Sequence, residues 1–147
     1  MPRLIDTHCH LDAAYFPEGP DAVIARAKAV GVFGFVCIGV GDTLAPAREA
    51  VALAARNANV WATAGVHPHD AKTLDGEALA ELGELCREPR VVAVGEAGLD
   101  YHYDHSPRET QRAAFSQMIR LAREVRKPLV VHTRAAAADT LAQLEAE

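Results

Sequence analysis

Histidine and carboxylate side chains follow the short apolar segments of this sequence in a regular way. His8 and His10 stand two residues apart after the first such segment, and Glu96 and His132 each follow directly after a later one. Imidazole and carboxylate groups bind Zn²⁺, Mn²⁺ and related divalent ions. A carboxylate can also bridge two ions. We therefore predict a metal centre made of these four residues, with Glu96 as its catalytic member.

The spacing of His8 and His10 would place both imidazoles on one side of an extended strand, because side chains two residues apart share a face. Cys9 would then point to the opposite side, away from an ion. Asp6 shares the side of the two histidines, where it would orient a ligand or cap a turn. The alternative for this short motif is a pair of histidines in a half-buried loop.

Glu96 follows an apolar segment that we expect to be a buried strand. An unpaired carboxylate in such a place is costly. A metal ion would satisfy it, and so would an ion pair with an arginine such as Arg134. Gly95 and Gly98 permit a bulge or a close backbone approach beside it.

Other polar residues near the expected strand ends are candidates to hold a substrate. Arg134 suits a phosphate or carboxylate, with a structural ion pair as the alternative. His67 and His69 flank Pro68 and would be substrate contacts, ligands or turn residues, whereas His105 is expected to be exposed. Asp100 would be a substrate contact or part of a solvated loop. The candidate substrate-binding residues are His67, Tyr101, His102 and Arg134.

The elements that must position these residues alternate between apolar runs and segments with helical spacing. Strands are expected at Leu4–His8, Phe33–Val40, Trp61–Val66, Val91–Gly95 and Leu129–His132, and helices near Asp21–Val30, Leu44–Ala58, Leu79–Leu85, Pro107–Arg126 and Asp139–Glu147. Units of about 30 residues, each a strand and then a helix, predict an α/β fold with a parallel sheet. In a barrel of this type the carboxyl ends of all strands converge on one face. A doubly wound sheet is the alternative, although no G-x-G sequence follows the first strand.

The helix expected at Pro107–Arg126 has the clearest boundaries. Ser106 would cap it, with Pro107 at its first position and Glu109 at its third. Lys127 and Pro128 would end it.

Composition excludes several classes of protein. The 147 residues are 50% apolar and 24% charged, which a disordered chain would not be. No apolar run approaches the ~18 residues of a membrane span. The length suits one domain, residues 1–147.

Charge and cysteine usage narrow the possibilities further. The chain has 15 Lys and Arg against 20 Asp and Glu, a net charge of −5, and so lacks the broad basic surface of a protein that coats nucleic acid. An enzyme that binds one phosphate locally is still allowed. Three scattered cysteines predict neither a disulfide framework nor a thiolate zinc site. Because the start does not look like a signal peptide, we expect a cytoplasmic protein.

Four segments resemble, in the same order, the motifs of the TatD family of metal-dependent hydrolases: Ile5–Asp12, Gly65–His69, Gly95–Tyr101 and His132–Arg134. The resemblance covers the whole chain. It implies a TIM-like barrel with two or more divalent ions (Mg²⁺, Mn²⁺ or Zn²⁺) in a phosphodiesterase, typically a deoxyribonuclease acting on single-stranded DNA or 3′ ends. His8 and His10 would hold one ion, Glu96 would bridge two, and His132 would hold the second.

The same resemblance implies parts that this sequence does not contain. A full barrel has eight strand–helix units, whereas about five are visible here. The family's metal-binding histidine after the sixth strand and its aspartate after the eighth have no counterpart before Glu147. The last residues lie in a helical run without a glycine or proline stop. We therefore expect an incomplete barrel, which is a fragment or pairs its open apolar edges with another copy.

Three other functions remain open. An amidohydrolase acting on amides or lactones can also carry H-x-H after its first strand, although many place a modified lysine where Glu96 stands here. A non-catalytic fragment that retains metal binding or subunit association would explain the missing ligands. A nucleic-acid binding module is disfavoured by the acidic balance of the chain.

Overall fold

The computed structural model describes residues 4–12 and 15–147. None of the helices within these residues has the length and apolar character needed to cross a membrane. The elements in chain order are β1 (Leu4–Cys9), α1 (Pro20–Ala29), β2 (Val32–Gly39), α2 (Ala45–Arg56), β3 (Val60–Ala64), the 3-10 helix η1 (Pro68–Thr73), α3 (Gly76–Arg87), β4 (Val91–Asp100), α4 (Arg108–Val125), β5 (Leu129–Arg134) and α5 (Ala137–Ala146).

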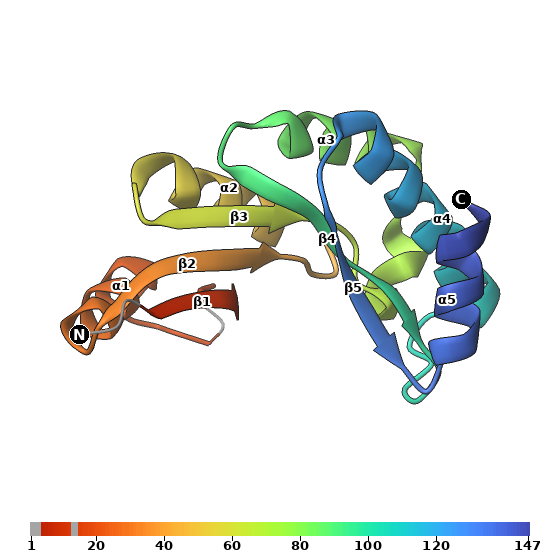
Figure 1. Cartoon of the computed structure of the whole chain (residues 1–147), viewed down its shortest axis with the longest axis horizontal. Coiled ribbons are helices and arrows are strands. Elements are labelled where there is room, and N and C mark those ends of the chain that lie inside the picture. Colours follow the sequence, from red (N-terminus) through yellow and green to blue (C-terminus); the bar gives the residue numbers. More distant parts are fainter. Residues whose placement is uncertain (1–3, 13–14) are drawn as a thin grey trace.

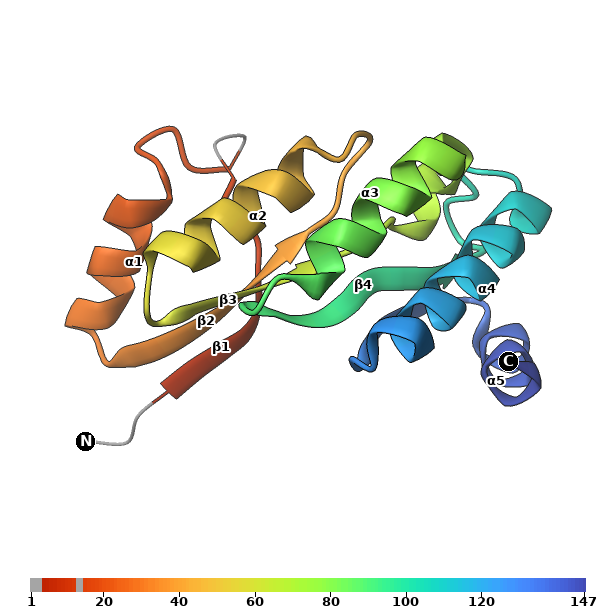
Figure 2. The same ribbon diagram turned by 90° about the horizontal axis from the view of Figure 1, so that it is seen from above.

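The strands form one parallel sheet in the order β1-β2-β3-β4-β5. The sheet is strongly twisted, and its helices lie on one side of it (Figure 1). Figure 2 shows α1, α2, α3 and α4 side by side above the strands. Among the described residues, β1 pairs only with β2 and β5 only with β4, so both are edge strands. The predicted series of five parallel strand–helix units is confirmed.

The apolar core lies between the sheet and this layer of helices. One cluster, which includes Phe35, Leu53 and Val60, packs beneath α1 and α2. The other, which includes Leu99 and Phe115, packs beneath α3 and α4. Full burial of a leucine or phenylalanine side chain stabilises a fold by about 1.5–3 kcal/mol. Packing against the helices thus makes one face of the sheet rigid, and functional side chains can lie on the other face.

Strand β4 is longer than expected, because it continues to Asp100 instead of ending at Gly95. Its pairing register with β5 shifts between Val94 and Ala97, at a bulge of the kind that Gly95 and Gly98 were expected to permit. Gly95 has a φ of 112° and Gly98 a φ of 152°. Glu96 therefore lies inside the strand at this bulge, and Asp100 takes the place at the strand end.

The predicted start of α4 is wrong. The helix begins at Arg108, and its N-cap residue Pro107 makes no side-chain capping bond. The Ser106 hydroxyl instead donates to the carbonyl oxygen of His69 at 2.7 Å and accepts from the backbone N–H of Lys72 at 3.2 Å. These bonds satisfy backbone groups of η1, an element that the sequence did not reveal, and they join η1 to the start of α4.

Candidate metal centre

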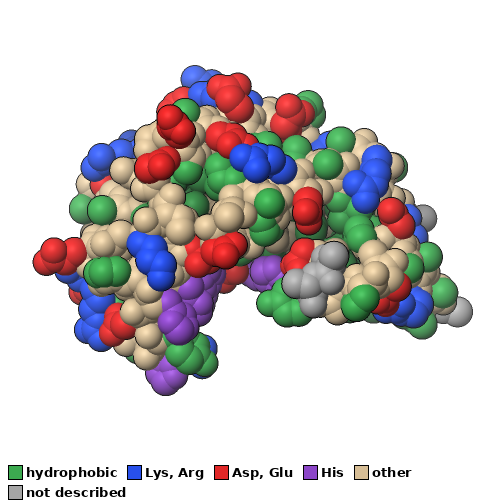
Figure 3. Space-filling model, turned by 180° about the vertical axis from the view of Figure 1, so that it is seen from behind, with side chains coloured by type: hydrophobic (Ala, Val, Ile, Leu, Met, Phe, Trp, Pro, Cys, Tyr) green, Lys and Arg blue, Asp and Glu red, His purple; other side chains and the backbone are tan. Residues whose placement is uncertain are grey.

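Histidine side chains gather along the hollow underside of the molecule (Figure 3). They come from the carboxyl-end parts of three strands of the sheet, as predicted. His8 lies in β1 with His10 just beyond it, and His132 lies in β5. His67 follows β3 and is the N-cap of η1. Glu96 stands between them in β4.

The two carboxylate oxygens of Glu96 face histidines from opposite edges of the sheet. Its Oε2 is 3.3 Å from Nε2 of His8, and its Oε1 is 3.1 Å from Nδ1 of His132. The hydrogen bond from His132 lowers the pKa of Glu96, and burial offsets this only in part. Glu96 is therefore ionised at neutral pH. Its partners are imidazoles and not Arg134, so the alternative of an arginine ion pair is wrong.

Two sets of ligand atoms share this carboxylate. His8, His10 and Glu96 form one set, and His67, Glu96 and His132 form the other. Within each set the ligand atoms lie within 4.8 Å of one another. An ion with bonds of about 2.0–2.2 Å holds tetrahedral ligands roughly 3.5 Å apart. Each set thus fits one divalent ion with small adjustments, and three protein ligands leave a coordination position for water or substrate.

The pKa values of the two histidines in the second set are shifted in opposite directions. The hydrogen bond with Glu96 raises the pKa of His132, against the opposing effect of burial. Burial and the neighbouring His132 lower the pKa of His67 to about 4, so His67 is neutral at pH 7. The Nε2 atom of His67 lies 3.1 Å from Nδ1 of His132, which brings a residue predicted as a substrate contact into the ligand set.

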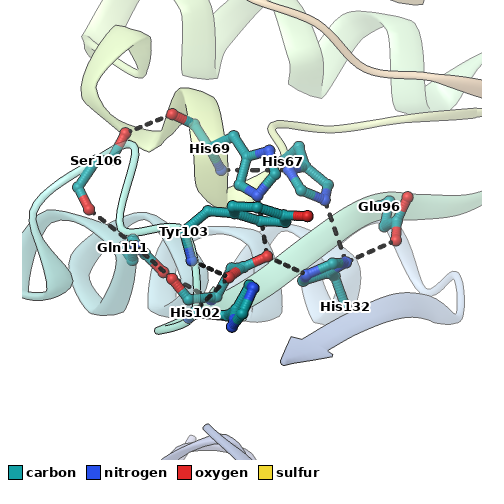
Figure 4. Close-up of polar contacts among 9 residues, drawn as sticks. His67, His69, Glu96, His102, Tyr103, Ser106, Gln111 and His132 are labelled. Carbon is teal, nitrogen blue, oxygen red and sulfur yellow. Dashed lines mark hydrogen bonds and ion pairs between the residues drawn. The ribbon is translucent and has the colours of Figure 1, made fainter. Parts of the chain in front are cut away.

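Asp100, expected to be a substrate contact or part of a solvated loop, instead lies at the end of β4 and bonds to two of the histidines. Its side chain is fully buried. Oδ2 lies 2.9 Å from Nε2 of His69 and 3.0 Å from Nε2 of His132, and Oδ1 accepts from the backbone N–H groups of His102 and Tyr103. Burial raises the pKa of Asp100, but the hydrogen bonds outweigh it and hold this pKa well below its ordinary value. Figure 4 shows the imidazoles of His67, His69 and His132 beside the loop that carries His102 and Tyr103.

Gln111 of α4 fixes the backbone around this carboxylate. Its Oε1 accepts from the backbone N–H of Asp100 at 2.8 Å, and its Nε2 donates to the carbonyl oxygen of the same residue at 3.0 Å. Nε2 also donates to the carbonyl oxygen of Ser106 at 2.8 Å. A buried glutamine with all these bonds makes the end of β4 rigid.

Tyr101 is not brought to the metal centre. Its hydroxyl donates to Asp139 of α5 at 2.7 Å and accepts from Arg112 of α4 at 2.9 Å. The side chain thus ties the loop after β4 to two helices.

The other two candidate substrate residues lie at the mouth of the site. His102 is exposed and contacts the ring of Tyr103 with centroids 4.6 Å apart. The guanidinium of Arg134, also exposed, lies 4.8 Å from the centroid of the same ring. His105 is exposed as expected and is parallel to Tyr103. These residues form a polar and aromatic rim beside the ligand sets.

Two further residues of β1, Asp6 and Cys9, make local contacts. The Sγ atom of Cys9 donates to the carbonyl oxygen of Val36 at 3.3 Å, on the side away from Glu96, as predicted. Asp6 accepts the backbone N–H of His8 at 3.1 Å, which corresponds to the local turn and not to a bond with a ligand side chain.

Comparisons with known proteins agree with this geometry. The family model for TatD related DNases matches residues 5–147. The 3′-5′ ssDNA/RNA exonuclease TatD of Cronobacter turicensis is 40% identical over 142 residues, which cover 97% of this chain and 53% of that protein. The uncharacterized metal-dependent hydrolase YabD of Bacillus subtilis is 39% identical over 145 residues, which cover 98% of this chain and 56% of that protein.

A solved structure shows the same arrangement of elements. The crystal structure of YJJV, a TatD homolog from Escherichia coli, matches with a TM-score of 0.88 and 29% identity, over 98% of this chain and 56% of that one. The prediction of parallel βα units of the TIM-like barrel type is confirmed, and the described strands form about half of such a barrel. The chain spans about half the length of the relatives that it matches.

Proposed function

This chain belongs to the family of TatD related DNases, and we propose that it supplies a two-ion metal centre to a hydrolase that removes nucleotides from the 3′ end of single-stranded nucleic acid. The observation that carries the proposal is Glu96, whose two oxygens face two separate groups of histidines. The Cronobacter relative is named as a 3′-5′ ssDNA/RNA exonuclease, which supports a nucleic-acid substrate.

In this proposal His8 and His10 would hold one ion, His132 would hold a second, and Glu96 would be shared between the two. The nitrogen and oxygen ligands suit Mg²⁺, Mn²⁺ or Zn²⁺ to different degrees. Divalent ions at such a centre polarise a phosphoryl oxygen and make water a stronger nucleophile. The protein's contribution is a negatively charged Glu96 fixed at the bulge of β4.

The substrate would enter along the rim of the hollow. Arg134 and His102 are exposed there and would bind phosphate or sugar oxygens, with His67 deeper in the site. Tyr101 would act indirectly, because its hydroxyl is already bonded to Arg112 and Asp139.

Self-association is a further part of the proposal. The edge strands expose apolar side chains: Leu4 and Ile5 of β1 are 55% and 54% exposed, and Val131 of β5 is 38% exposed. Unpaired apolar edges favour pairing with another chain. A cytoplasmic location is also proposed, and the three free cysteines support a reducing compartment.

The test is hydrolysis of 3′-labelled single-stranded DNA with Mn²⁺ or Mg²⁺. Glu96→Gln removes the bridging charge and should lower the rate by at least about 100-fold. Glu81→Gln is the matched control, because Glu81 pairs with Arg48 on the helical layer, and it should retain activity.

Equal cleavage by the wild-type and Glu96→Gln proteins would contradict the proposal. An inactive wild-type chain that still binds ions would instead support the alternative of a non-catalytic part of the family fold. Turnover of amides or lactones without DNA cleavage would favour the amidohydrolase alternative.

A further inference from the structure

Three exposed planar side chains lie together beside the metal centre. Tyr103 and His105 come from the loop between β4 and α4, and Arg134 comes from the end of β5. The rings of Tyr103 and His105 are parallel to within 4°, with their centroids 5.4 Å apart. The guanidinium carbon of Arg134 lies 4.8 Å from the centroid of the Tyr103 ring. We call these three side chains the planar stack.

The loop that carries the planar stack is held by bonds that do not involve the stacked rings. The carboxylate of Asp100 accepts the backbone N–H groups of His102 and Tyr103, each at 3.0 Å. Asp104 pairs with Arg108 of α4 at 2.7 Å. Because these bonds fix the backbone, the ring of Tyr103 has a fixed orientation. A ligand that binds this ring does not have to order the loop, which favours binding.

The planar stack contributes little to the fold itself. The side chain of Tyr103 is 48% exposed. Within residues 4–12 and 15–147, its hydroxyl makes no hydrogen bond, and the guanidinium of Arg134 makes neither a hydrogen bond nor an ion pair. An exposed cation–π contact stabilises a protein only slightly. The N–H groups of Arg134 are therefore available to oxygen acceptors while its plane lies against the ring.

The planar stack begins close to the second ligand set. The rings of Tyr103 and His69 meet edge to face with centroids 5.5 Å apart, and the His69 ring lies 4.3 Å from that of His67. Figure 4 shows Tyr103 beside these two imidazoles. His67 belongs to the second ligand set. The planar stack is thus in the immediate neighbourhood of a nucleotide whose phosphate is bound at the metal centre.

We propose that the planar stack is a nucleobase-binding subsite, in which an unpaired base extends the stack of Tyr103 and His105 and Arg134 binds a phosphate of the same strand. This inference rests on the proposed function, because the nucleic-acid substrate comes from it. Aromatic rings and guanidinium planes bind unpaired bases of any sequence, since every base has a π face. In a duplex the faces of each base are covered by its neighbours. The planar stack would therefore select single strands.

The first measurement is binding to two probes by fluorescence anisotropy in EDTA, where ions are absent and no strand is cleaved. One probe is a labelled oligothymidylate of about ten nucleotides, and the other is the same sugar-phosphate strand without bases. We expect the wild-type chain to bind oligothymidylate about 5- to 100-fold more tightly than the abasic strand. Equal affinity for both probes, or binding of neither, would overturn the proposal.

The second measurement places the base contact at the planar stack. Tyr103→Ala should weaken oligothymidylate binding about 5- to 100-fold and leave abasic binding unchanged, whereas Tyr103→Phe keeps the ring and should bind like the wild type. His105→Ala should also weaken oligothymidylate binding. Phe33→Ala is the matched control, because Phe33 is a 40% exposed aromatic residue at the start of β2. Wild-type affinity in both Tyr103→Ala and His105→Ala would overturn the proposal.

Hydrolysis of single-stranded DNA separates this inference from the proposed function. Tyr103→Ala should raise KM with little change in kcat, because the ring contacts a base and not the reacting phosphate. Cleavage with an unchanged KM in this variant would overturn the planar stack as a base-binding subsite and leave the metal centre intact. Base-dependent binding by a wild-type chain that cleaves no DNA would support the planar stack and contradict the proposed function.

Discussion

Thr63 is a buried residue of β3 whose hydroxyl group is expected to destabilise the folded protein. Its Oγ1 atom makes no hydrogen bond with any residue that the structure describes, although the side chain is fully buried. A buried unsatisfied hydroxyl costs about 1–3 kcal/mol. Thr63→Val should therefore raise the free energy of unfolding in urea by about 1 kcal/mol.

Thr140 provides the matched control. It is also buried, but its hydroxyl donates to the carbonyl oxygen of Ala136 and lies 2.9 Å from the hydroxyl of Thr133. Thr140→Val should lower the free energy of unfolding. If Thr63→Val were as destabilising as Thr140→Val, the hydroxyl of Thr63 would have a partner in solution.

The cysteines give a prediction about pH. Burial raises the pKa of Cys9 to about 12 and the pKa values of Cys37 and Cys86 to about 11. These pKa values are higher in the folded than in the unfolded state, so burial of the neutral thiols favours folding. Their contribution to the free energy of unfolding is complete below the unfolded thiol pKa and is lost as the pH rises toward 11–12. Iodoacetamide at about pH 8 should label the folded protein much more slowly than the unfolded one. Equal rates would contradict this burial.

At the residue scale, the sequence predicted side chains whose type and local spacing are informative. His8, His10, Glu96 and His132 could be identified because they stand at or just after the ends of short apolar segments, and the structure brings them together in two groups that share Glu96. Asp100 could not, because its role depends on imidazoles 31 and 32 residues away. The apolar residues between Glu96 and Asp100 were the available signal that the strand continues.

At the scale of elements, the approach of β5 to β4 depends on one glycine. A Cβ atom at Gly98 would lie 1.9 Å from the carbonyl oxygen of His132, and its φ of 152° also disfavours any side chain. Gly98→Ala should force the strands apart and lower the free energy of unfolding by more than about 3 kcal/mol. The same variant should lose metal affinity, because it displaces His132.

Gly76 is the control for this substitution. It lies at the start of α3 with no atom within 4 Å of a Cβ position. Alanine there should be neutral or stabilising by up to about 1 kcal/mol. A Gly98→Ala protein as stable as Gly76→Ala would refute the close approach of the two strands.

The boundaries of elements show where sequence reasoning stops. The stop of α4 was predicted correctly, since Arg126 has a left-handed φ of 56° and Pro128 follows. Its start was not, because the capping preference of serine is a local rule. The Ser106 hydroxyl does not cap α4 but bonds to η1, where it donates to the carbonyl oxygen of His69 and accepts from the backbone N–H of Lys72. Such tertiary contacts leave no local pattern.

At the scale of the whole molecule, the open edges of the sheet predict concentration-dependent association. Sedimentation velocity over an about 100-fold range of concentration should show it. Ile5→Lys and Val131→Lys place a charge on β1 and β5 and should reduce association. Ala80→Lys is the control, because Ala80 is exposed on α3, which packs on the interior strands β3 and β4. A wild-type chain that stays monomeric throughout would contradict edge pairing.

The measurement that tests the central claim most directly is the number of ions bound per chain, by native mass spectrometry with Zn²⁺. We expect two for the wild type, because Glu96 belongs to both ligand sets. His10→Ala and His132→Ala should each retain one ion, and Glu96→Ala should retain neither. A wild-type chain that binds no ion, or a Glu96→Ala protein that keeps both, would contradict a centre bridged by this carboxylate.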